Sequence, residues 1–114
     1  MTATQATLDR LTRIPGVRGA LIASADDGLV VAEQLMDGID GRAAAALTGS
    51  LVARLGRTTV AAGVRPPVFL HLRGDQGSIL AAPGEELVLV VVVGPAANLG
   101  LARLEMLDAA GRLG

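Results

Sequence analysis

The most pronounced feature of the hydrophobic pattern is a run of seven apolar residues at 87–93 (LVLVVVV). Pro83-Gly84 and the acidic pair Glu85-Glu86 precede this run, and Gly94-Pro95 follows it. A short, uninterrupted apolar run between turn residues is typical of a strand that is buried on both faces. The pattern therefore predicts that this segment is the central strand of a small sheet.

Two strands are predicted near the start of the chain, at 17–24 and 29–34. They are joined by residues 25–28 (ADDG), and a connection this short makes the two strands antiparallel neighbours. Both segments carry apolar residues on both faces. Helices are therefore expected to cover the sheet on both sides.

A second group of strands is predicted at 68–72 and 78–82, followed by the central run. Pro66-Pro67 comes directly before 68–72, and proline at the entrance of a strand favours an edge position. The turn residues 73–77 (RGDQG) connect the two segments as a hairpin. With the first pair, the sequence predicts five antiparallel strands.

Three helices are predicted around these strands. Residues 4–13 form the first helix, which Pro15-Gly16 ends. Asp40 is a suitable N-cap for a long second helix that runs to about Ala62. Asn98 is a suitable N-cap for the last helix.

The long helix carries two stripes of residues at helical spacing. The larger side chains are expected to lie on the sheet; they are Ala44, Leu47, Leu51 and Leu55. The second stripe contains only small residues, Ala46, Gly49, Ala53 and Gly56. A glycine inside a helix costs about 1 kcal/mol relative to alanine, so this stripe predicts a close backbone approach, most simply by a second copy of the same helix. The alternative is that the leucines hold the helix and the glycines are only tolerated.

Length, composition and charge narrow the class of protein. The 114 residues predict a single domain, 1–114, because the chain is too short for two cores. Hydrophobic residues make up 51% and charged residues 18%, which leaves more apolar surface than a small monomer hides and favours an oligomer. The net charge is -1 and every basic residue is arginine, so nucleic acid is not an expected partner.

The sequence shows no segment for secretion or membrane insertion. Residues 1–13 lack the basic region and apolar core of a secretory signal, and no apolar stretch approaches the roughly 18–20 residues that cross a bilayer. We therefore expect a cytoplasmic protein without direct membrane insertion. Cysteine is absent and histidine occurs once, so neither a metal site nor a cofactor is expected.

Three motifs, in this order and spacing, carry a resemblance to a known family. They are IPGVRGALI at 14–22, DDGLVVA at 26–32 and VVGPAANLGLAR at 92–103. Together with the predicted order of helices and strands, they make the chain resemble the roadblock family, the small dynein-light-chain-like domains that partner Ras-like GTPases. The bacterial members that act with small GTPases are the nearer kin. The resemblance covers essentially the whole chain.

The resemblance implies an α+β, three-layer sandwich of the roadblock/profilin type. Its five-stranded antiparallel sheet has the second helix on one face and the first and third helices on the other. Such domains form dimers in which the third strands of two copies pair across a twofold axis, giving a ten-stranded sheet with the second helices side by side. The dimer interface implied for this chain comprises Ala46, Gly49, Ala53, Gly56, Val68, Phe69, Leu70, His71 and Leu72.

The function that the resemblance implies is that of a non-enzymatic homodimeric adaptor, which binds a Ras-like small GTPase and regulates its GTP cycle. Contact with the GTPase usually involves the paired second helices. The exposed positions expected to bind the partner are Arg42, Ser50, Arg54 and Arg57. Bacterial relatives accelerate hydrolysis by repositioning the GTPase's own residues, so no catalytic arginine is expected here.

Catalytic and ligand-binding alternatives are weaker. Residues 94–100 connect a strand to a helix as a nucleotide-binding turn does, but they lack the GxGxxG and Walker A spacings. His71 is the only candidate general base, and it would need Ser24, Ser50 or Ser78 together with an orienting acid. A structural histidine near the dimer edge, with a backbone partner, is favoured. No catalytic residue is therefore predicted.

Two other functional classes stay open at this point. A small-molecule sensor is compatible with the size of the domain, although Phe69 is the only aromatic residue available to line a pocket. A dimerisation module with a partner other than a GTPase is the second alternative.

Overall fold

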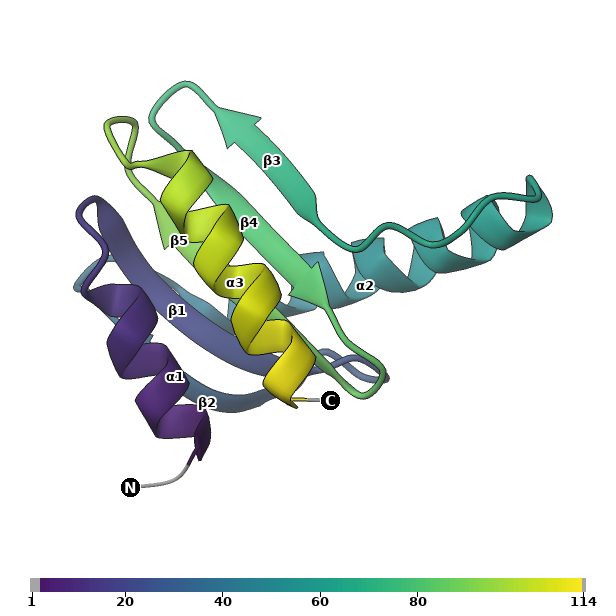
Figure 1. Ribbon diagram of the computed structural model, residues 1–114, viewed down its shortest axis with the longest axis horizontal. Helices are drawn as coiled ribbons and strands as arrows, with labels where there is room; N and C mark the ends of the chain where they lie inside the picture. The colour runs from purple at the N-terminus through teal and green to yellow at the C-terminus, as the bar shows by residue number, and fades with distance from the viewer. Residues whose placement is uncertain (1–2, 114) are drawn as a thin grey trace.

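The computed structural model describes residues 3–113, which form a helix, two strands, a second helix, three strands and a third helix in that order (Figure 1). The helices are α1 (Ala3–Thr12), α2 (Gly41–Ala61) and α3 (Leu99–Leu113). The strands are β1 (Val17–Ser24), β2 (Val30–Leu35), β3 (Leu70–Gly74), β4 (Gly77–Pro83) and β5 (Leu87–Val93). Every predicted helix and strand is present, and most ends lie within one residue of the prediction.

The five strands form one antiparallel sheet in the order β2-β1-β5-β4-β3. The apolar run that forms β5 lies in the middle, paired with β1 on one side and β4 on the other. Its position as the central strand is confirmed. The two edges of the sheet are β2 and β3, and the prediction of β3 as an edge strand is also confirmed.

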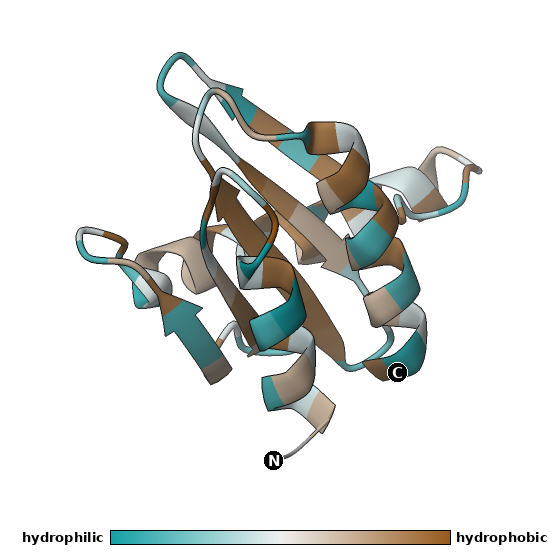
Figure 2. Cartoon of the chain, turned by 60° about the vertical axis from the view of Figure 1, so that its left-hand side comes forward, coloured by the Kyte–Doolittle hydropathy of each residue, from teal (hydrophilic) through white to brown (hydrophobic). Residues whose placement is uncertain are grey.

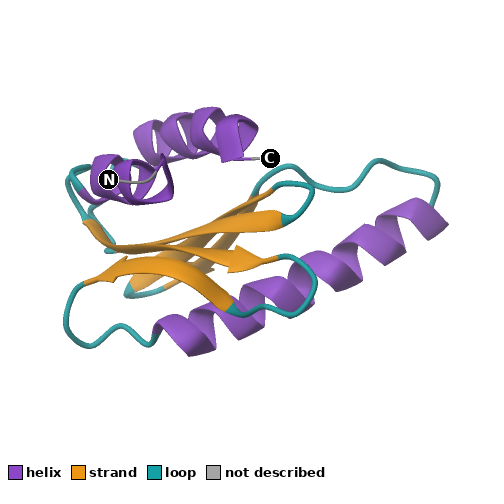
Figure 3. Ribbon diagram, turned by 90° about the horizontal axis from the view of Figure 1, so that it is seen from below, coloured by secondary structure: helices purple, strands orange, loops and turns teal. Residues whose placement is uncertain are grey.

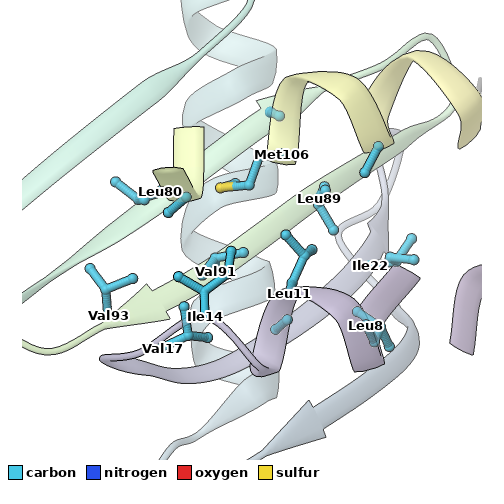
Figure 4. Packing of buried hydrophobic residues seen from close by; sticks show 14 residues of the cluster. Leu8, Leu11, Ile14, Val17, Ile22, Leu80, Leu89, Val91, Val93 and Met106 are labelled. Atoms are coloured by element: carbon cyan, nitrogen blue, oxygen red, sulfur yellow. The ribbon is translucent and has the colours of Figure 1, made fainter. Parts of the chain in front are cut away.

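Helices cover both faces of the sheet, as Figure 3 shows from the side. The α1/α3 core lies between the sheet and helices α1 and α3 (Figure 4); its members are Leu8, Leu11, Ile14, Val17, Ala20, Ile22, Leu80, Ala82, Leu89, Val91, Val93, Ala102, Met106 and Ala109. The α2 core lies on the opposite face and contains Leu21, Ala23, Ala44, Ala45, Ala81, Val88 and Val90. The predicted arrangement of three layers is confirmed.

The apolar run is buried on both faces because its side chains alternate between the two cores. Leu89 and Val91 point into the α1/α3 core, whereas Val88 and Val90 point into the α2 core, and all four are at most 1% exposed. Figure 2 shows the resulting hydrophobic colouring along the middle of the sheet. A strand that sends bulky apolar residues to both sides requires a helix layer on each side.

The third strand begins two residues later than predicted. Pairing with β4 starts at Leu70, so Val68 and Phe69 precede the strand. The Phe69 side chain packs against the α1/α3 core, and the guanidinium carbon of Arg103 lies 5.5 Å from the ring centroid. The prediction that Val68 and Phe69 belong to the edge strand is therefore wrong, and the contacts of Phe69 with the core and Arg103 account for its different placement.

Helix α2 approaches the sheet through small residues and not through its leucines. Its buried residues are Gly41, Ala44, Ala45, Thr48 and Gly49. Leu47 is 51% exposed, so the prediction that the leucine stripe lies on the sheet is wrong, although Ala44 does lie there. Short side chains let the helix axis come closer to the strands. The Thr48 hydroxyl donates to the carbonyl of Ala44 at 2.8 Å, so its burial leaves no polar atom unsatisfied.

One glycine of α2 does mark a close backbone approach, but the neighbour belongs to the same chain. A Cβ atom at Gly49 would lie 3.0 Å from the Cα of Gly28, in the turn between β1 and β2. Gly28 itself has φ +71°, a conformation that glycine adopts without a Cβ clash. The prediction that a second copy approaches Gly49 is therefore wrong. A Cβ at Gly56, in contrast, would meet nothing within 4 Å.

The contact between Gly49 and the β1–β2 turn can be tested by overpacking. Gly49→Val should lower the free energy of unfolding by about 2 kcal/mol, because branched carbons would press on the backbone of Gly28. Gly111→Val is the control, since position 111 of α3 faces open space, and it should change stability by less than about 0.5 kcal/mol. Urea unfolding at equal protein concentration measures both; equal effects would contradict the contact.

The N-cap of α2 can be tested in the same way. The Asp40 carboxylate accepts a hydrogen bond from the Ala43 amide at 3.0 Å. Asp40→Ala should cost about 1 kcal/mol of unfolding free energy, whereas Asp40→Asn should retain most of the stability. The control is Asp37→Ala, which removes an exposed carboxylate from the loop before α2 and should have little effect on stability. A loss of stability with Asp37→Ala that equals the loss with Asp40→Ala would argue against the cap.

Candidate interaction surface

Helix α2 crosses the sheet with its first half and continues beyond it with its second half, as Figure 3 shows. All of its buried residues lie at or before Gly49, and Val52 is the last that packs against the α2 core. From residue 53 to the end of the helix no residue is buried. The helix therefore carries a long surface that this chain does not cover.

An open apolar surface lies beside α2, on the side of the sheet that leads to β3. Leu72, Ile79 and Val92 are neighbours across three adjacent strands, and each is half-buried. Leu47 of α2 lines the same shallow groove as Ile79 and Val92. We call these four residues the open apolar surface. Because α2 approaches the sheet on its small residues, its leucine side flanks this groove.

The backbone of β3 forms the free edge next to this surface. Within the described residues β3 pairs only with β4, so its outer amides and carbonyls have no strand partner there. Leu70 packs on the α2 core, and Leu72, two residues along, points to the same face. His71 points to the other face. Leu70, His71 and Leu72 are therefore the residues of β3 among those expected at a dimer interface.

The small stripe of α2 is divided by the fold. Gly49 is buried against the turn of its own chain and has no room for another helix. Ala46 is exposed, and Ala53 and Gly56 are half-buried. These three residues stay accessible for contact with a second copy.

The four residues expected to bind a partner, Arg42, Ser50, Arg54 and Arg57, are all exposed. Ser50, Arg54 and Arg57 follow one another at spacings of four and three, which places them on one side of the helix. This side lies opposite Ala45, Thr48 and Val52, which face the sheet. We call Ser50, Arg54 and Arg57 the α2 ridge; Arg42 lies near the start of the helix.

His71 makes a contact that the sequence did not indicate. Its Nε2 atom lies 2.9 Å from the Oγ atom of Ser78 on the adjacent strand, so the expected backbone partner is wrong. Within residues 3–113 no carboxylate hydrogen-bonds to this pair, and His71 is exposed. A Ser-His pair without an orienting acid or a closed pocket lacks the parts that nucleophilic catalysis needs.

The other candidate segments have structural roles. Asp75 and Gln76 form the two-residue turn between β3 and β4. Asn98 caps α3, since its side chain accepts a hydrogen bond from the Leu101 amide at 3.0 Å. No group of three or more His, Asp or Glu side chains among the described residues could hold a metal ion. Within the same residues, no helix combines the length and apolarity needed to cross a membrane.

Comparisons with known proteins agree with this architecture. Residues 3–93 match the model of the Roadblock/LC7 domain. An uncharacterised protein of Methanocaldococcus jannaschii is 31% identical over 90% of this chain and 86% of its own length. Among solved structures, Myxococcus xanthus MglB is 25% identical, with a TM-score of 0.87 over 99% of this chain and 93% of that chain.

A Roadblock/LC7 domain from Streptomyces avermitilis shares the fold, with a TM-score of 0.78, 21% identity, and coverage of 95% of this chain and 92% of that chain. The matched family model extends from α1 to the end of β5, and the MglB fold includes α3 as well. The three-layer fold implied by the resemblance is therefore confirmed. The chain belongs to the Roadblock/LC7 domain family.

Proposed function

We propose that this chain is a non-enzymatic homodimeric adaptor that binds a Ras-like small GTPase and regulates its GTP cycle. The observation that carries the proposal is the open apolar surface beside the unpaired β3 edge, in a fold of the Roadblock/LC7 family. A GTPase is proposed as the partner because the family resemblance implies one, and the chain matches the Roadblock/LC7 family over residues 3–93.

A second copy of the chain is the occupant that fits the open apolar surface. Antiparallel pairing of two β3 edges would extend the sheet to ten strands and place both α2 helices on the same face. Each copy then covers Leu47, Leu72, Ile79 and Val92 of the other or brings them to the shared interface. Burying one such side chain fully is worth roughly 1.5–3 kcal/mol, so a few of them can offset the cost of association.

The dimer can be tested with matched charge substitutions. Leu47→Glu should shift the protein to monomers at micromolar concentration, because it places a carboxylate in the open apolar surface. Leu104→Glu is the control; Leu104 is 66% exposed on α3, on the opposite layer, and its substitution should leave the dimer intact. Light scattering after size-exclusion chromatography measures the mass, and circular dichroism verifies the fold.

Three results would contradict the proposed dimer. They are a monomeric wild type, a Leu47→Glu variant that remains a dimer, and a Leu104→Glu variant that dissociates as readily as Leu47→Glu. If the protein is a dimer but binds no GTPase from its own cell in either nucleotide state, the alternative function, a dimerisation module with another partner, is supported instead.

The role of the arginines on α2 gives the functional test. Arg54→Ala and Arg57→Ala should weaken binding of the GTPase but leave the rate of GTP hydrolysis at saturating adaptor within about twofold, because no arginine finger is proposed. Removing an arginine finger would lower that rate by about 10³-fold or more. Interferometry measures binding of the GTPase, and phosphate release measures the rate of GTP hydrolysis, so the two effects are measured separately. Arg10→Ala on α1 is the control and should change neither the binding nor the rate of hydrolysis. If Arg54→Ala or Arg57→Ala abolished the stimulated hydrolysis and left binding intact, the arginine would be catalytic and the proposal would be wrong.

A further inference from the structure

The charges of this chain are segregated along its sequence. No acidic residue occurs from Gly41 to Gly74, and five of the ten arginines lie in that segment: Arg42, Arg54, Arg57, Arg65 and Arg73. All eleven acidic residues lie outside it. The segment therefore carries +5 and the remainder of the chain -6, so the net charge of -1 conceals a strongly polarised molecule.

The arginines of the basic segment are available for a partner. All five are exposed. The ion pair that the structure forms within residues 3–113 joins Arg112 to Asp108 on α3 and leaves the basic segment out. Because no carboxylate within residues 3–113 forms an ion pair with these guanidinium groups, their field extends into solvent over roughly a Debye length, about 10 Å at 0.1 M salt.

The α2 ridge is the part of the basic segment that is best placed for contact. Arg54 and Arg57 lie on the side of α2 that faces away from the sheet, in the half of the helix that extends beyond the α2 core. In a twofold dimer paired through the β3 edges, the two α2 helices, and with them the two ridges, lie on one face of the ten-stranded sheet. Dimerisation would therefore double the positive charge on that face.

We infer that the α2 ridge docks an acidic protein surface, with Arg54 and Arg57 as its main contacts. The inference rests on the proposed function in taking α2 as the partner-binding helix, and it adds the chemistry of the partner. Exposed guanidinium groups recognise carboxylates through paired N–H donors. Opposite charges on the two surfaces speed association and make it sensitive to salt.

A protein surface fits the ridge better than an anionic membrane does. Membrane-binding basic segments are typically clusters of roughly four to eight neighbouring Lys or Arg residues. The α2 ridge contains two arginines, and the remaining arginine of the helix, Arg42, lies about 18 Å from Arg54 along the axis, at 1.5 Å per residue. This spacing suits separate carboxylates on a folded partner.

The test uses an acidic probe, so that it does not depend on any particular GTPase. A 15N-labelled sample of the full chain is titrated with an oligoglutamate peptide of about twelve residues and followed by NMR. The largest shifts should fall on residues 50–65, and the affinity should drop roughly fivefold or more when the salt is raised from about 50 to 300 mM. Arg54→Ala combined with Arg57→Ala should remove these shifts.

The control is Arg10→Ala combined with Arg13→Ala, which removes the same charge from outside the basic segment and should leave the peptide bound to α2. Shifts spread evenly over all arginines, or unaffected by the α2 substitutions, overturn the inference. If the protein sediments with phosphatidylcholine vesicles that contain about 30% phosphatidylserine, and the α2 double variant does not, the inference is overturned in favour of a lipid surface. Peptide binding at α2 without binding of any GTPase would uphold the acidic docking surface and reject the proposed GTPase partner.

Discussion

The structure depends on the burial of β5 on both faces. Its side chains enter the α1/α3 core and the α2 core alternately, and a strand of this kind is stable only when a layer of helix lies on each side. β1 and β4 pair with it and extend both cores. β2 and β3 complete the sheet of five strands and form its two edges.

The second constraint is the close approach of α2 to the sheet. Ala44, Ala45, Thr48 and Gly49 form the contact, and none of them has a long side chain. The helix therefore lies near the strands, but its leucines are displaced to the side and its second half is free. The open apolar surface and the α2 ridge are both exposed because α2 packs on the sheet through these small residues.

The candidate functional features of this protein are surfaces for contact with other proteins. The grooves are shallow and shared between apolar strand residues and the flank of a helix, while the Ser78–His71 pair stands exposed without a carboxylate partner among the described residues. The apolar surface and the β3 edge are suited to another copy of the chain, and the charged ridge to a different protein. The proposed dimer and the proposed partner therefore use neighbouring parts of α2, with Leu47 in its first half and Arg54 and Arg57 in its second half.

The sequence by itself determined the order of helices and strands, the central strand, the caps at Asp40 and Asn98, and the edge position of β3, because local patterns and turn residues encode these features. Only the tertiary structure decided which side of α2 meets the sheet and which neighbour Gly49 approaches. The two stripes of α2 have similar helical spacing, and the choice between them depends on how closely two backbones can approach, which is a property of the packed layers and not of the helix alone. Likewise, Phe69 joins the α1/α3 core because Arg103 and the core residues are there to receive it, and no local pattern around residue 69 encodes that contact.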